Sequence, residues 1–540
     1  MADGHRAHVR GLGAHAHDPP RGGPVTARSA RGAGARRGLD RRACVLRPAP
    51  GRSRCAEPAP RVAVVGGGIA GLAAATGLAE RGVRVTVYER EQALGGRLAG
   101  RAVRLRDGSG ATMSRGFHAF FRQYYNLRGL LRRADPGLTT LRGLPDYPLR
   151  HSDGLSDSFS RVPRTPPWSA LGFAALSPTF GARDLARMRP RAALPLLDVR
   201  VPEVYERLDG TSARELLAAI RFPEAAHHLA FEVFSRSFFA DPGELSAAEM
   251  ALMFHIYFLG SSEGLLFDVP QEPYPQALWE PLGRYLEKLG VELRTGEDVG
   301  EVRPSGGGLA VAAGGGEEAY EATVLALDPA GLRALAGASG QLADPGWRAR
   351  VGRLRTAPPF LVSRLWLDRP VAGERPGFLG TSGYGPLDNV SVLERWEGEA
   401  ARWAARTGGS VVELHAYALD PAADRGRTQE RLRAELARVY PETGAARAVD
   451  ALHEWREDCP LFPVGGYRDR PTVRTGDPRV VVAGDMVRTG LPVALMERAA
   501  TSGFLAANAL LEGWGVRGHT LWTVPRRGRS APLRALARLG

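Results

Sequence analysis

The pattern of hydrophobic positions predicts two buried strands joined by a helix close to residue 61. Runs of β-branched and apolar residues mark the first strand at Val62–Val65 and the second at Val83–Tyr88. The Ala-rich segment between them, which follows Gly71, is typical of a helix that packs on a sheet. A strand, a helix and a second strand in this order form a βαβ unit with parallel strands. The chain is therefore expected to have an α/β fold.

Later hydrophobic runs predict more elements of the same kind. The expected elements are a helix at Pro281–Gly290, a strand at Val291–Val302, a strand at Ala322–Pro329, a buried strand in the segment that starts at Arg479, and a long helix that starts near Pro492. Alternation of apolar and polar residues at Phe360–Arg369 and Ser410–Leu419 predicts a second sheet, which we expect to roof a substrate cavity.

The middle of the chain is predicted to be helical. Ser212 with Glu215, and Ser246 with Glu249, have the spacing of capping boxes, and each pair precedes apolar residues. Closely spaced aromatic residues at Gly116–Arg133 predict another helix, whose aromatic face contacts either the protein core or the cofactor and substrate.

The turn after the first strand carries the residues that bind a dinucleotide. Gly66 allows a tight turn, Gly68 lets the backbone approach a pyrophosphate, and Gly71 lets helix and strand pack closely. The helix that follows presents free N–H groups to the anion. Glu89 ends the second strand, where its carboxylate can accept hydrogen bonds from both ribose hydroxyls. A chance match to the glycine pattern is common, but the strand, helix, strand and acidic residue together make this one specific.

Two further motifs point to FAD rather than to a nicotinamide cofactor. Gly95, Gly96 and Arg97 resemble the extended motif of flavoproteins related to amine oxidases and carotenoid desaturases, in which an arginine lies along the FAD pyrophosphate. Near the other end, Gly484 and Asp485 end a buried strand, so that Asp485 can bind the ribityl or pyrophosphate region. The long helix after them would direct its N-terminus at the flavin and stabilise negative charge there. The cofactor-binding residues are predicted to be Gly66, Gly68, Ile69, Ala70, Gly71, Glu89, Arg90, Gly96, Arg97, Val299 (through its backbone, to the adenine), Gly484, Asp485 and Met496.

Composition divides the chain into a basic leader and a folded part. The 540 residues carry a net charge of +14, but residues 1–60 hold 12 Arg and no Lys against four acidic residues, which leaves only +6 for the rest. This distribution does not favour a nucleic-acid partner. The leader has too few large apolar residues to form a core, and we expect it to be disordered. Two interpretations of the leader stay open. It is a functional basic arm, or the sequence was read from a mistaken upstream start codon and the real protein begins near Pro58. The leader also lacks the apolar run of a secretory signal.

The remaining chemistry of the sequence limits the classes of site. Three cysteines, Cys44, Cys55 and Cys459, offer neither a disulfide framework nor the spacing of a metal site, so no metal is predicted and a reducing, cytoplasmic location is expected. No apolar stretch is long enough to cross a membrane. In Trp168–Leu197, apolar residues precede arginines, as in an element that dips into the inner face of the cell membrane beneath a basic collar. The alternative is a pair of ordinary packed helices.

Longer stretches of the sequence narrow the resemblance to flavoproteins to one group of these proteins. Gly116–Asn126 and Leu495–Gly503 resemble the GLHxFFGxYxN and SMEGAxLSG motifs of the carotenoid desaturases, a phytoene desaturase-like branch of the flavin amine oxidases. The strings GFHAFFRQYYNLR, YFLGSSEGLLFDVP, FLGTSGYGPLDNVSVL and GGSVVELHAY are similar to the isorenieratene synthases, which are carotene desaturase/methyltransferases.

The resemblance implies a Rossmann-like FAD-binding domain of the glutathione reductase/amine oxidase type, interwoven with an α+β substrate domain. The expected parts are a leader at 1–60, FAD-binding segments at 61–115, 271–335 and 471–512, a helical substrate segment at 116–270, a sheet segment at 336–470, and a basic tail at 513–540.

The implied reaction converts the β-ionone end groups of β-carotene into aromatic φ rings. Hydride transfer to flavin leaves an allylic cation, a 1,2-methyl shift moves the charge, and proton loss quenches it. Aromatic faces stabilise such a cation by about 0.5–2 kcal/mol each, and the candidates are Phe117, Phe120, Phe121, Tyr124, Tyr257 and Trp366. His118 is the first candidate for the proton acceptor, with Arg122 and Glu497 as alternatives, and a structural hydrogen-bonding role is open for each. The electron acceptor would be a quinone or oxygen.

Three rival functions remain open from the sequence. A linear carotene desaturase or isomerase would use the same scaffold. An amine oxidase would share the nucleotide motif, but those enzymes supply an aromatic residue just after the last motif, and here none occurs between Asp485 and Phe504. Cys459 lies loosely where some of them tether flavin, although a small core thiol is the alternative. A carotenoid-binding flavoprotein without activity is the third.

Overall fold

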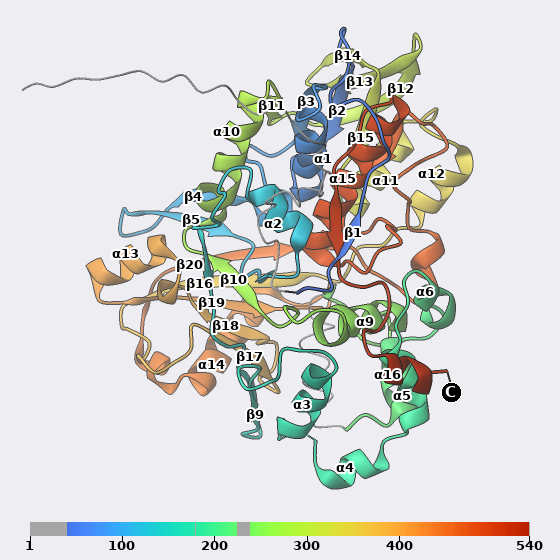
Figure 1. Cartoon of the computed structure of the whole chain (residues 1–540). Coiled ribbons are helices and arrows are strands. Elements are labelled where there is room, and N and C mark those ends of the chain that lie inside the picture. The colour runs from blue at the N-terminus through green and yellow to red at the C-terminus, as the bar shows by residue number, and fades with distance from the viewer. Residues whose placement is uncertain (1–39, 179, 224–237, 539–540) are drawn as a thin grey trace, which may run out of the picture. The chain divides into compact units, whose positions relative to one another are not determined.

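A computed structural model describes residues 40–178, 180–223 and 238–538 (Figure 1). A five-stranded sheet, all of whose neighbouring strands are parallel, forms the nucleotide-binding core, in the order β11-β3-β2-β15-β21. Its strands are β2 (Arg61–Val65), β3 (Arg84–Glu89), β11 (Glu292–Thr295), β15 (Ala322–Leu325) and β21 (Val480–Val482). The predicted α/β core, assembled from three separate chain segments, is confirmed.

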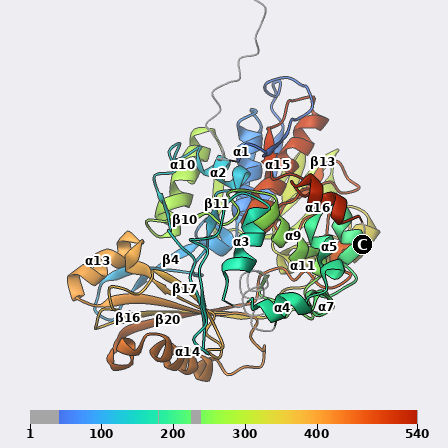
Figure 2. The ribbon, with the colours of Figure 1, turned by 60° about the horizontal axis from the view of Figure 1, so that its bottom comes forward.

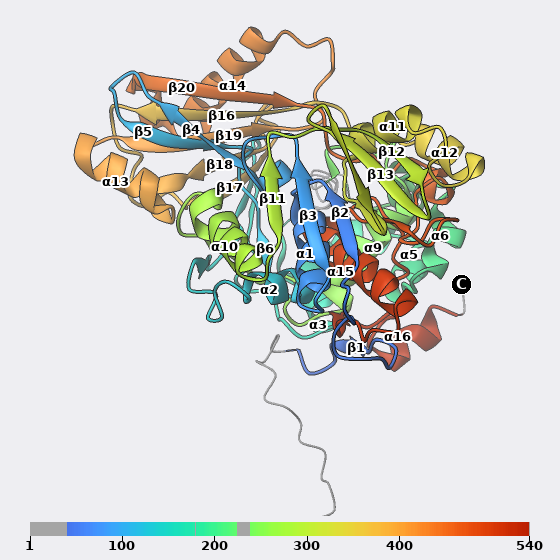
Figure 3. The same cartoon turned by 90° about the horizontal axis from the view of Figure 1, so that it is seen from above.

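Both faces of this sheet are covered, as parallel strands require. Helices α1 (Ile69–Ala79), α10 (Glu280–Lys288) and α15 (Leu495–Gly513) pack on one face, where Val64, Val85 and Val324 are fully or almost fully buried. The antiparallel strands β12 (Val299–Ser305), β13 (Gly308–Ala313) and β14 (Gly316–Tyr320), with helices α11 (Pro329–Ala338) and α12 (Pro345–Gly352), cover the other. Figure 3 shows β11, β3 and β2 of the parallel sheet from above, with β12 and β13 beside them.

Helices α1 and α15 join the two ends of the folded chain. They lie side by side because glycine allows a close approach: a side chain at Gly503 of α15 would collide with the backbone of Ala70 in α1. The long C-terminal helix, predicted to start near Pro492, starts at Leu495.

A seven-stranded mixed sheet forms the second region, in the order β20-β16-β19-β18-β17-β8-β9. Its strands are β8 (Leu149–His151), β9 (Ser156–Asp157), β16 (Phe360–Leu367), β17 (Phe378–Ser382), β18 (Asn389–Val392), β19 (Ser410–Ala416) and β20 (Ala448–Arg456). Val412, Leu414 and Ala416 of β19 belong to the same buried cluster as residues of helix α14 (Arg425–Val439), whereas Val411 lies on the other face, with helix α13 (Gly398–Thr407). The second sheet predicted from Phe360–Arg369 and Ser410–Leu419 is thus confirmed, and its strands β16 and β19 are buried on both faces.

A group of helices lies beside the seven-stranded sheet, as Figure 2 shows with the bottom of the molecule turned forward. They are α3 (Trp168–Leu176), α4 (Ala182–Arg187), α5 (Pro190–Leu197), α6 (Glu203–Leu208), α7 (Ala213–Ile220) and α9 (Ala247–Phe254). Ser212 and Glu215 form the predicted capping box of α7. Ser246 caps α9, but Glu249 does not complete the second box, since its side chain turns into the core and pairs with two arginines.

Two predicted elements are wrong in their extent. The strand expected at Val291–Val302 is broken at Gly296, whose φ of +76° is left-handed, so that its halves join different sheets as β11 and β12. The helix expected at Gly116–Arg133 covers only Tyr125–Leu131 as α2. Gly116 has a φ of +92°, and Phe120 and Phe121 form a short strand, β6, that pairs with β10 (Phe267–Pro270). Strands β7 (Leu141–Gly143), β4 (Gly100–Arg104) and β5 (Gly110–Ser114) lie beside this region.

The leader and the tail differ from the sequence-based expectation. Residues 1–39 lie outside the described residues, but β1 (Cys44–Leu46) pairs with β22 (Leu521–Thr523), and Asp40 pairs with Arg529 at 2.7 Å. The expectation of disorder throughout residues 1–60 is therefore wrong for their last third, and the tail, which includes α16 (Ala531–Leu536), is folded against it. The other domain bounds stay predictions, because the described residues belong to one compact unit.

Candidate active site

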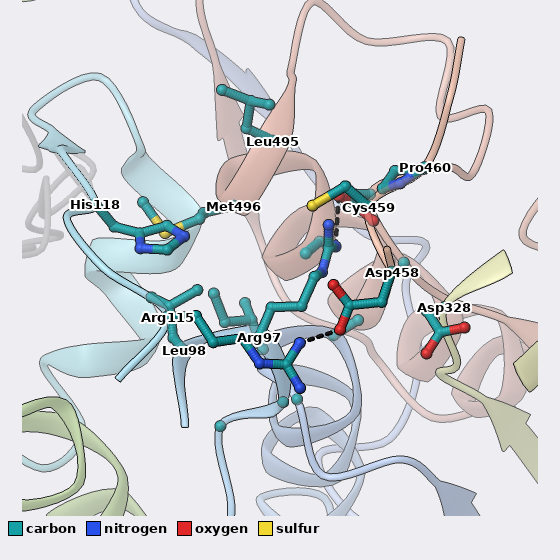
Figure 4. Close-up of a pocket in the computed structure, with 18 of the residues that line it drawn as sticks. Arg97, Leu98, Arg115, His118, Asp328, Asp458, Cys459, Pro460, Leu495 and Met496 are labelled. Carbon is teal, nitrogen blue, oxygen red and sulfur yellow. Dashed lines mark hydrogen bonds and ion pairs between the residues drawn. The ribbon is translucent and has the colours of Figure 1, made fainter. Parts of the chain in front are cut away.

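One cavity of about 550 Å³ runs from the parallel sheet to the seven-stranded sheet. Nucleotide-motif residues line one end, and aromatic residues from several distant segments line the other. Figure 4 shows Arg97, Arg115, His118 and Met496, from three different chain segments, around the same space. A single cavity of this kind can hold a cofactor next to an apolar substrate.

The nucleotide end depends on glycines where the backbone passes close to itself. Gly66 has a φ of +109° and lies against the carbonyl of Ala326, and a side chain at Gly71 would collide with the carbonyl oxygen of Gly66. Gly68 is different: a methyl group there would have only the Cα of Gly96 nearby, at 3.8 Å, so its open side faces the cavity. The N-terminus of α1 begins at this point. An anion would meet backbone N–H groups here.

Glu89 is held in place by backbone donors. Its Oε2 accepts a hydrogen bond from the N–H of Gly67 at 2.8 Å, and its Oε1 accepts one from the N–H of Glu91 at 2.9 Å. Burial raises the pKa of this carboxyl group, and the two N–H groups oppose that effect. The side chain lines the cavity, and each of its oxygens has capacity to accept a further hydrogen bond, which suits the hydroxyls of a ribose.

Two ion pairs connect the motifs at the two ends of the chain. Nη2 of Arg97 donates to Oδ2 of Asp485 at 2.6 Å, and Arg115 pairs with Asp458. Each of these four residues lines the cavity. Gly95 makes room for Trp279, whose indole N–H donates to the carbonyl of Leu98 and so fixes the turn before Arg97. Arg97 is thereby held in position by the protein itself.

All the predicted cofactor-binding residues except Gly71 line this cavity. Gly71 lies behind Gly66, in the packing role that its position implies. Val299 begins β12 and reaches the cavity at the far nucleotide end, and Arg90 lies 3.8 Å from Asp328 at its rim. Their individual contacts to a cofactor stay predictions.

Aromatic side chains form the walls of the other end. Of the six predicted candidates, Phe117, Phe121, Tyr124 and Tyr257 line the cavity, whereas Phe120 and Trp366 are buried in the protein core. The sequence did not identify the aromatic residues that complete the walls, which are Tyr147, Phe159, Phe238, Phe239, Phe267, Phe360, Phe378, Tyr417 and Phe462. Rings stack directly across this space, as Phe117 does on Phe378 with centroids 4.3 Å apart.

His118 lies in this cavity as a neutral imidazole. Its Nδ1 is 2.9 Å from the carbonyl oxygen of Gly116, which can only accept, so Nδ1 carries the proton and Nε2 keeps a lone pair. Burial lowers the pKa of His118 to about 4. Its ring lies beside Met496 in Figure 4. This is the geometry of a group that can accept a proton inside the cavity.

The other two candidates for the proton acceptor lie elsewhere. Arg122 binds Asp268 at 3.0 Å, is 38 % exposed, and does not line the cavity. Glu497 is buried beneath α2, where it accepts hydrogen bonds from the N–H groups of Asn126 and Leu127 at 2.9 Å each. It anchors the first turn of α2 to α15, which is the structural hydrogen-bonding role that the sequence left open.

A polar row on β19 escaped the sequence analysis. His415 lines the cavity, and its Nε2 lies 2.9 Å from Oε1 of Glu413 and its Nδ1 2.6 Å from the hydroxyl of Tyr417. Arg364 of β16 binds the same glutamate at 2.7 Å. Residues 413 and 415 of β19 and residue 417 just after it share one face, and His415 and Tyr417 of this row line the cavity. The alternation was recognised, but nothing in it told which face was inward.

A second buried cluster holds the segment between Asp485 and α15. Glu249 pairs with Arg470 and, at 2.8 Å, with Arg498. Arg498 donates to the carbonyls of Val493 and Asp485, which fixes the backbone next to Asp485. Breaking a buried pair of this kind costs about 3–5 kcal/mol. The cluster therefore ties the last cofactor motif to the substrate region.

The cavity fits FAD by the chemistry of its donors. A helix N-terminus, an open glycine, an arginine and a hydrogen-bonded glutamate line its nucleotide end. They provide an anion site, a close backbone approach and a ribose acceptor. Met496 and the start of α15 adjoin the aromatic end, where the ring system would meet a substrate.

Comparisons with known proteins agree with this geometry. Residues 69–511 match the family described as flavin containing amine oxidoreductase. The chain belongs to this family. It is therefore an FAD-dependent oxidoreductase. A putrescine oxidase variant of known structure has a TM-score of 0.62 over 84 % of this chain and 99 % of its own, at 18 % identity, and shows the fold.

Two curated relatives are similar over nearly the full length. The carotenoid phi-ring synthase of Streptomyces griseus is 73 % identical, over 94 % of this chain and 98 % of its own. The carotenoid phi-ring synthase of Chlorobaculum tepidum is 26 % identical, over 87 % of this chain and 91 % of its own.

Two kinds of feature, a metal site and a membrane-spanning helix, are absent from the described residues. Within residues 40–178, 180–223 and 238–538, no group of three or more His, Cys, Asp or Glu side chains is placed to hold a metal ion. In the same part of the chain, no helix is both long and apolar enough to span a bilayer.

Proposed function

We propose that this chain is a carotenoid φ-ring synthase that converts β-ionone end groups of β-carotene into aromatic rings. The observation that carries the proposal is the aromatic-walled cavity continuous with the nucleotide site, in a chain so similar to the Streptomyces relative. Bound FAD would supply the acceptor for the hydride. No methyl donor is needed, since the methyl group moves within the substrate.

The walls of the cavity suit a cationic substrate. Rings of Phe117, Phe121 and Tyr257 line the apolar end. An aromatic face turned to a nearby cation stabilises it by about 0.5–2 kcal/mol. The same walls exclude water, which would otherwise trap the cation as an alcohol. His118 then accepts the proton whose loss forms the new double bond, and its neutral state leaves it ready to do so.

Product analysis tests the reaction. Cells that make this chain would be supplied with β-carotene, γ-carotene or lycopene, and their pigments read by absorption and mass. Each β-ionone ring is expected to lose four hydrogen atoms with no change in carbon number. Unchanged β-carotene with altered lycopene would instead indicate a linear desaturase or isomerase. Bleaching of the flavin by an amine would indicate an amine oxidase. If no carotene bleaches the flavin under anaerobic conditions, the chain would be a carotenoid-binding protein without activity.

We further propose that helix α3 docks the protein on the inner face of the cell membrane. Trp168, Leu171 and Leu176 are 62 %, 52 % and 57 % exposed, which is unusual for side chains of this size. Four exposed arginines follow, Arg183, Arg187, Arg189 and Arg191. Phe173 of α3 stacks on Phe159, a residue of the cavity wall, so a substrate dissolved in lipid would enter beside the docked helix. A cytoplasmic location follows from this orientation toward anionic lipid.

Vesicle binding tests the docking surface. The whole chain is expected to sediment with vesicles of phosphatidylglycerol, and the double variant Trp168→Ser with Leu171→Ser to bind at least about tenfold more weakly, because both apolar side chains leave the interface. Leu289→Ser, at another exposed leucine, is the matched control. Equal binding of all three proteins would contradict the proposal. Reoxidation of the reduced enzyme by a quinone in those vesicles, compared with oxygen, would identify the electron acceptor.

A further inference from the structure

A second, small cavity lies behind His118 and is separate from the main one. Its volume is about 20 Å³, which is enough for one water molecule. His118 and Phe117 line both cavities. The small one combines apolar residues, such as Val269 and Leu393, with the polar side chains of Ser114, Glu272, Tyr274, Arg364, Glu397 and Glu413. His118 is therefore the polar side chain that the dry cavity and the polar one share.

The reaction requires an outlet for protons. Each desaturation on the proposed path breaks two C–H bonds: one hydrogen leaves as a hydride to FAD and the other as a proton to a base of the protein. An apolar, aromatic-walled cavity gives that proton no solvent to enter. Before the same base can act in a second desaturation, it must release the proton that it accepted in the first.

We propose that the small cavity is the outlet, with His118 at its inner end, Glu397 as the relay group and Glu272 at its mouth. The inference rests on the proposed function. Nε2 of His118 takes the proton from the ring carbon of the substrate, whose C–H electron pair becomes the new double bond. The imidazolium passes a proton to a water molecule in the small cavity, Glu397 takes the proton up from that water, and it leaves to solvent past Glu272. The products of each round are the double bond, the reduced acceptor and one proton in solution.

The carboxylates of this cavity are suited to different tasks. Burial alone would raise the pKa of Glu413, but Arg364 and His415 lower it to about 2, so Glu413 stays charged and acts as a fixed partner. Desolvation raises the pKa of Glu397 to about 7, Arg364 opposes this, and the negative charges of Glu413, Glu399 and Glu272 add to it. Glu397 can thus bind and release a proton near neutral pH.

The mouth of the outlet is formed by the segment before α13. Glu272 is 38 % exposed and pairs with the exposed Arg402 at 2.7 Å. A side chain at Gly398 would collide with the carboxylate of Glu272, so this carboxylate lies directly against the residue next to Glu397. Nδ1 of His118, at the other end, is 3.4 Å from the hydroxyl of Tyr274, a further wall residue. Polar groups therefore line the way from the substrate to the surface.

The pH dependence of the reaction has a defined sign under this proposal. Glu397 must be ionised to accept a proton, so the rate of ring oxidation is expected to rise with pH through about 7. The variant Glu397→Gln removes the relay group. We expect the rate at pH above 7 to fall about tenfold or more and the rise near pH 7 to disappear, while Glu397→Asp restores both in part.

A direct readout follows Glu397 without turnover. In the infrared spectrum of the chain without substrate, one carbonyl band of a protonated carboxyl group should disappear between about pH 6 and 8 in the unchanged protein, and this band should be missing in Glu397→Gln. Burial raises the pKa of Glu497 to about 8, so Glu497 contributes a second band, which Glu397→Gln should keep. Glu394→Gln is the matched control. Glu394 is close in sequence but binds Ser410 and the N–H of Val411, and it does not line the cavity, so its variant should keep both the band and the pH profile.

The outcomes separate this inference from the proposed function. If the unchanged protein forms no aromatic rings from β-carotene, the proposed function is wrong. If it forms them, but Glu397→Gln keeps the same rate, pH profile and infrared band while holding flavin normally, the outlet alone is refuted. A loss of flavin or of thermal stability in Glu397→Gln is resolved by Glu397→Asp, which must recover the pH profile for the inference to stand.

Discussion

The two ends of the cavity are built in different ways. At the nucleotide end, most of the chemistry comes from Gly66 to Arg97, a short stretch in which backbone N–H groups and close approaches between glycines do the binding. At the substrate end, side chains from β6, β16, β17, β19 and the loop before β21 meet only because the chain folds back several times. A cofactor shared by many enzymes can be bound by one local motif, whereas a particular substrate is bound by a surface assembled over long range.

The comparison is tested most strongly at His118. We expect His118→Gln to lower the rate of ring oxidation about 10²–10⁴-fold, the usual contribution of a positioned proton acceptor, and to leave flavin binding unchanged. Pigment analysis gives the rate and visible absorption gives the flavin content. His453→Gln is the control, because His453 binds Ser363 outside the main cavity. A variant that loses its flavin together with its activity would show that the two ends are not independent.

The opposite end is tested by Gly68. The φ of Gly68 is −80°, and the protein atom nearest to an added methyl group would be the Cα of Gly96 at 3.8 Å. Gly68→Ala should therefore keep its thermal stability. The methyl group would nevertheless stand between the backbone and the pyrophosphate. We expect the dissociation constant for FAD to rise about 10- to 100-fold, for a steric cost of about 1–3 kcal/mol. Fluorescence titration of the flavin-free protein measures it.

Gly337→Ala serves as the control for that experiment. Gly337 lies in α11 with nothing near the position of its missing side chain, and FAD affinity should not change. An unchanged affinity in Gly68→Ala would place the pyrophosphate elsewhere and remove the basis for the local motif.

The same contrast explains what the sequence could and could not reveal. Gly66, Gly68 and Glu89 were predicted to reach the cavity because their spacing already encodes the geometry of the turn. Arg364 and Glu413 meet across two strands whose pairing no local pattern specifies. The extent of the helix at Gly116–Arg133 was wrong for a similar reason, since pairing of Phe120 and Phe121 with a distant strand overrode the local periodicity.

Glu497 provides a smaller test, which asks whether this residue stabilises the fold or takes part in the reaction. Its carboxylate accepts the N–H groups of Asn126 and Leu127, and in Glu497→Gln the amide would turn an N–H group toward one of these donors. We expect a loss of about 1–3 kcal/mol in the free energy of unfolding, with the rate per bound flavin nearly unchanged. Glu512→Gln, at the exposed end of the same helix, should cost less than about 1 kcal/mol. A large fall in rate at normal stability would instead restore Glu497 as a candidate for the chemistry.

Cys459 gives the smallest expected effect, at the point where the two ends of the cavity meet. The thiol is buried and lines the cavity with Arg97 and Asp485, close to where some amine oxidases attach flavin covalently. Burial raises the pKa of Cys459 to about 12, although Arg97 opposes this, so the nucleophilic thiolate is scarce at neutral pH. Acid precipitation should therefore release all the flavin, both from the unchanged protein and from Cys459→Ala, which should lose about 1 kcal/mol of stability or less. Flavin that stayed with the precipitate of the unchanged protein alone would show a covalent bond, and the local motif would then not be sufficient to hold the cofactor.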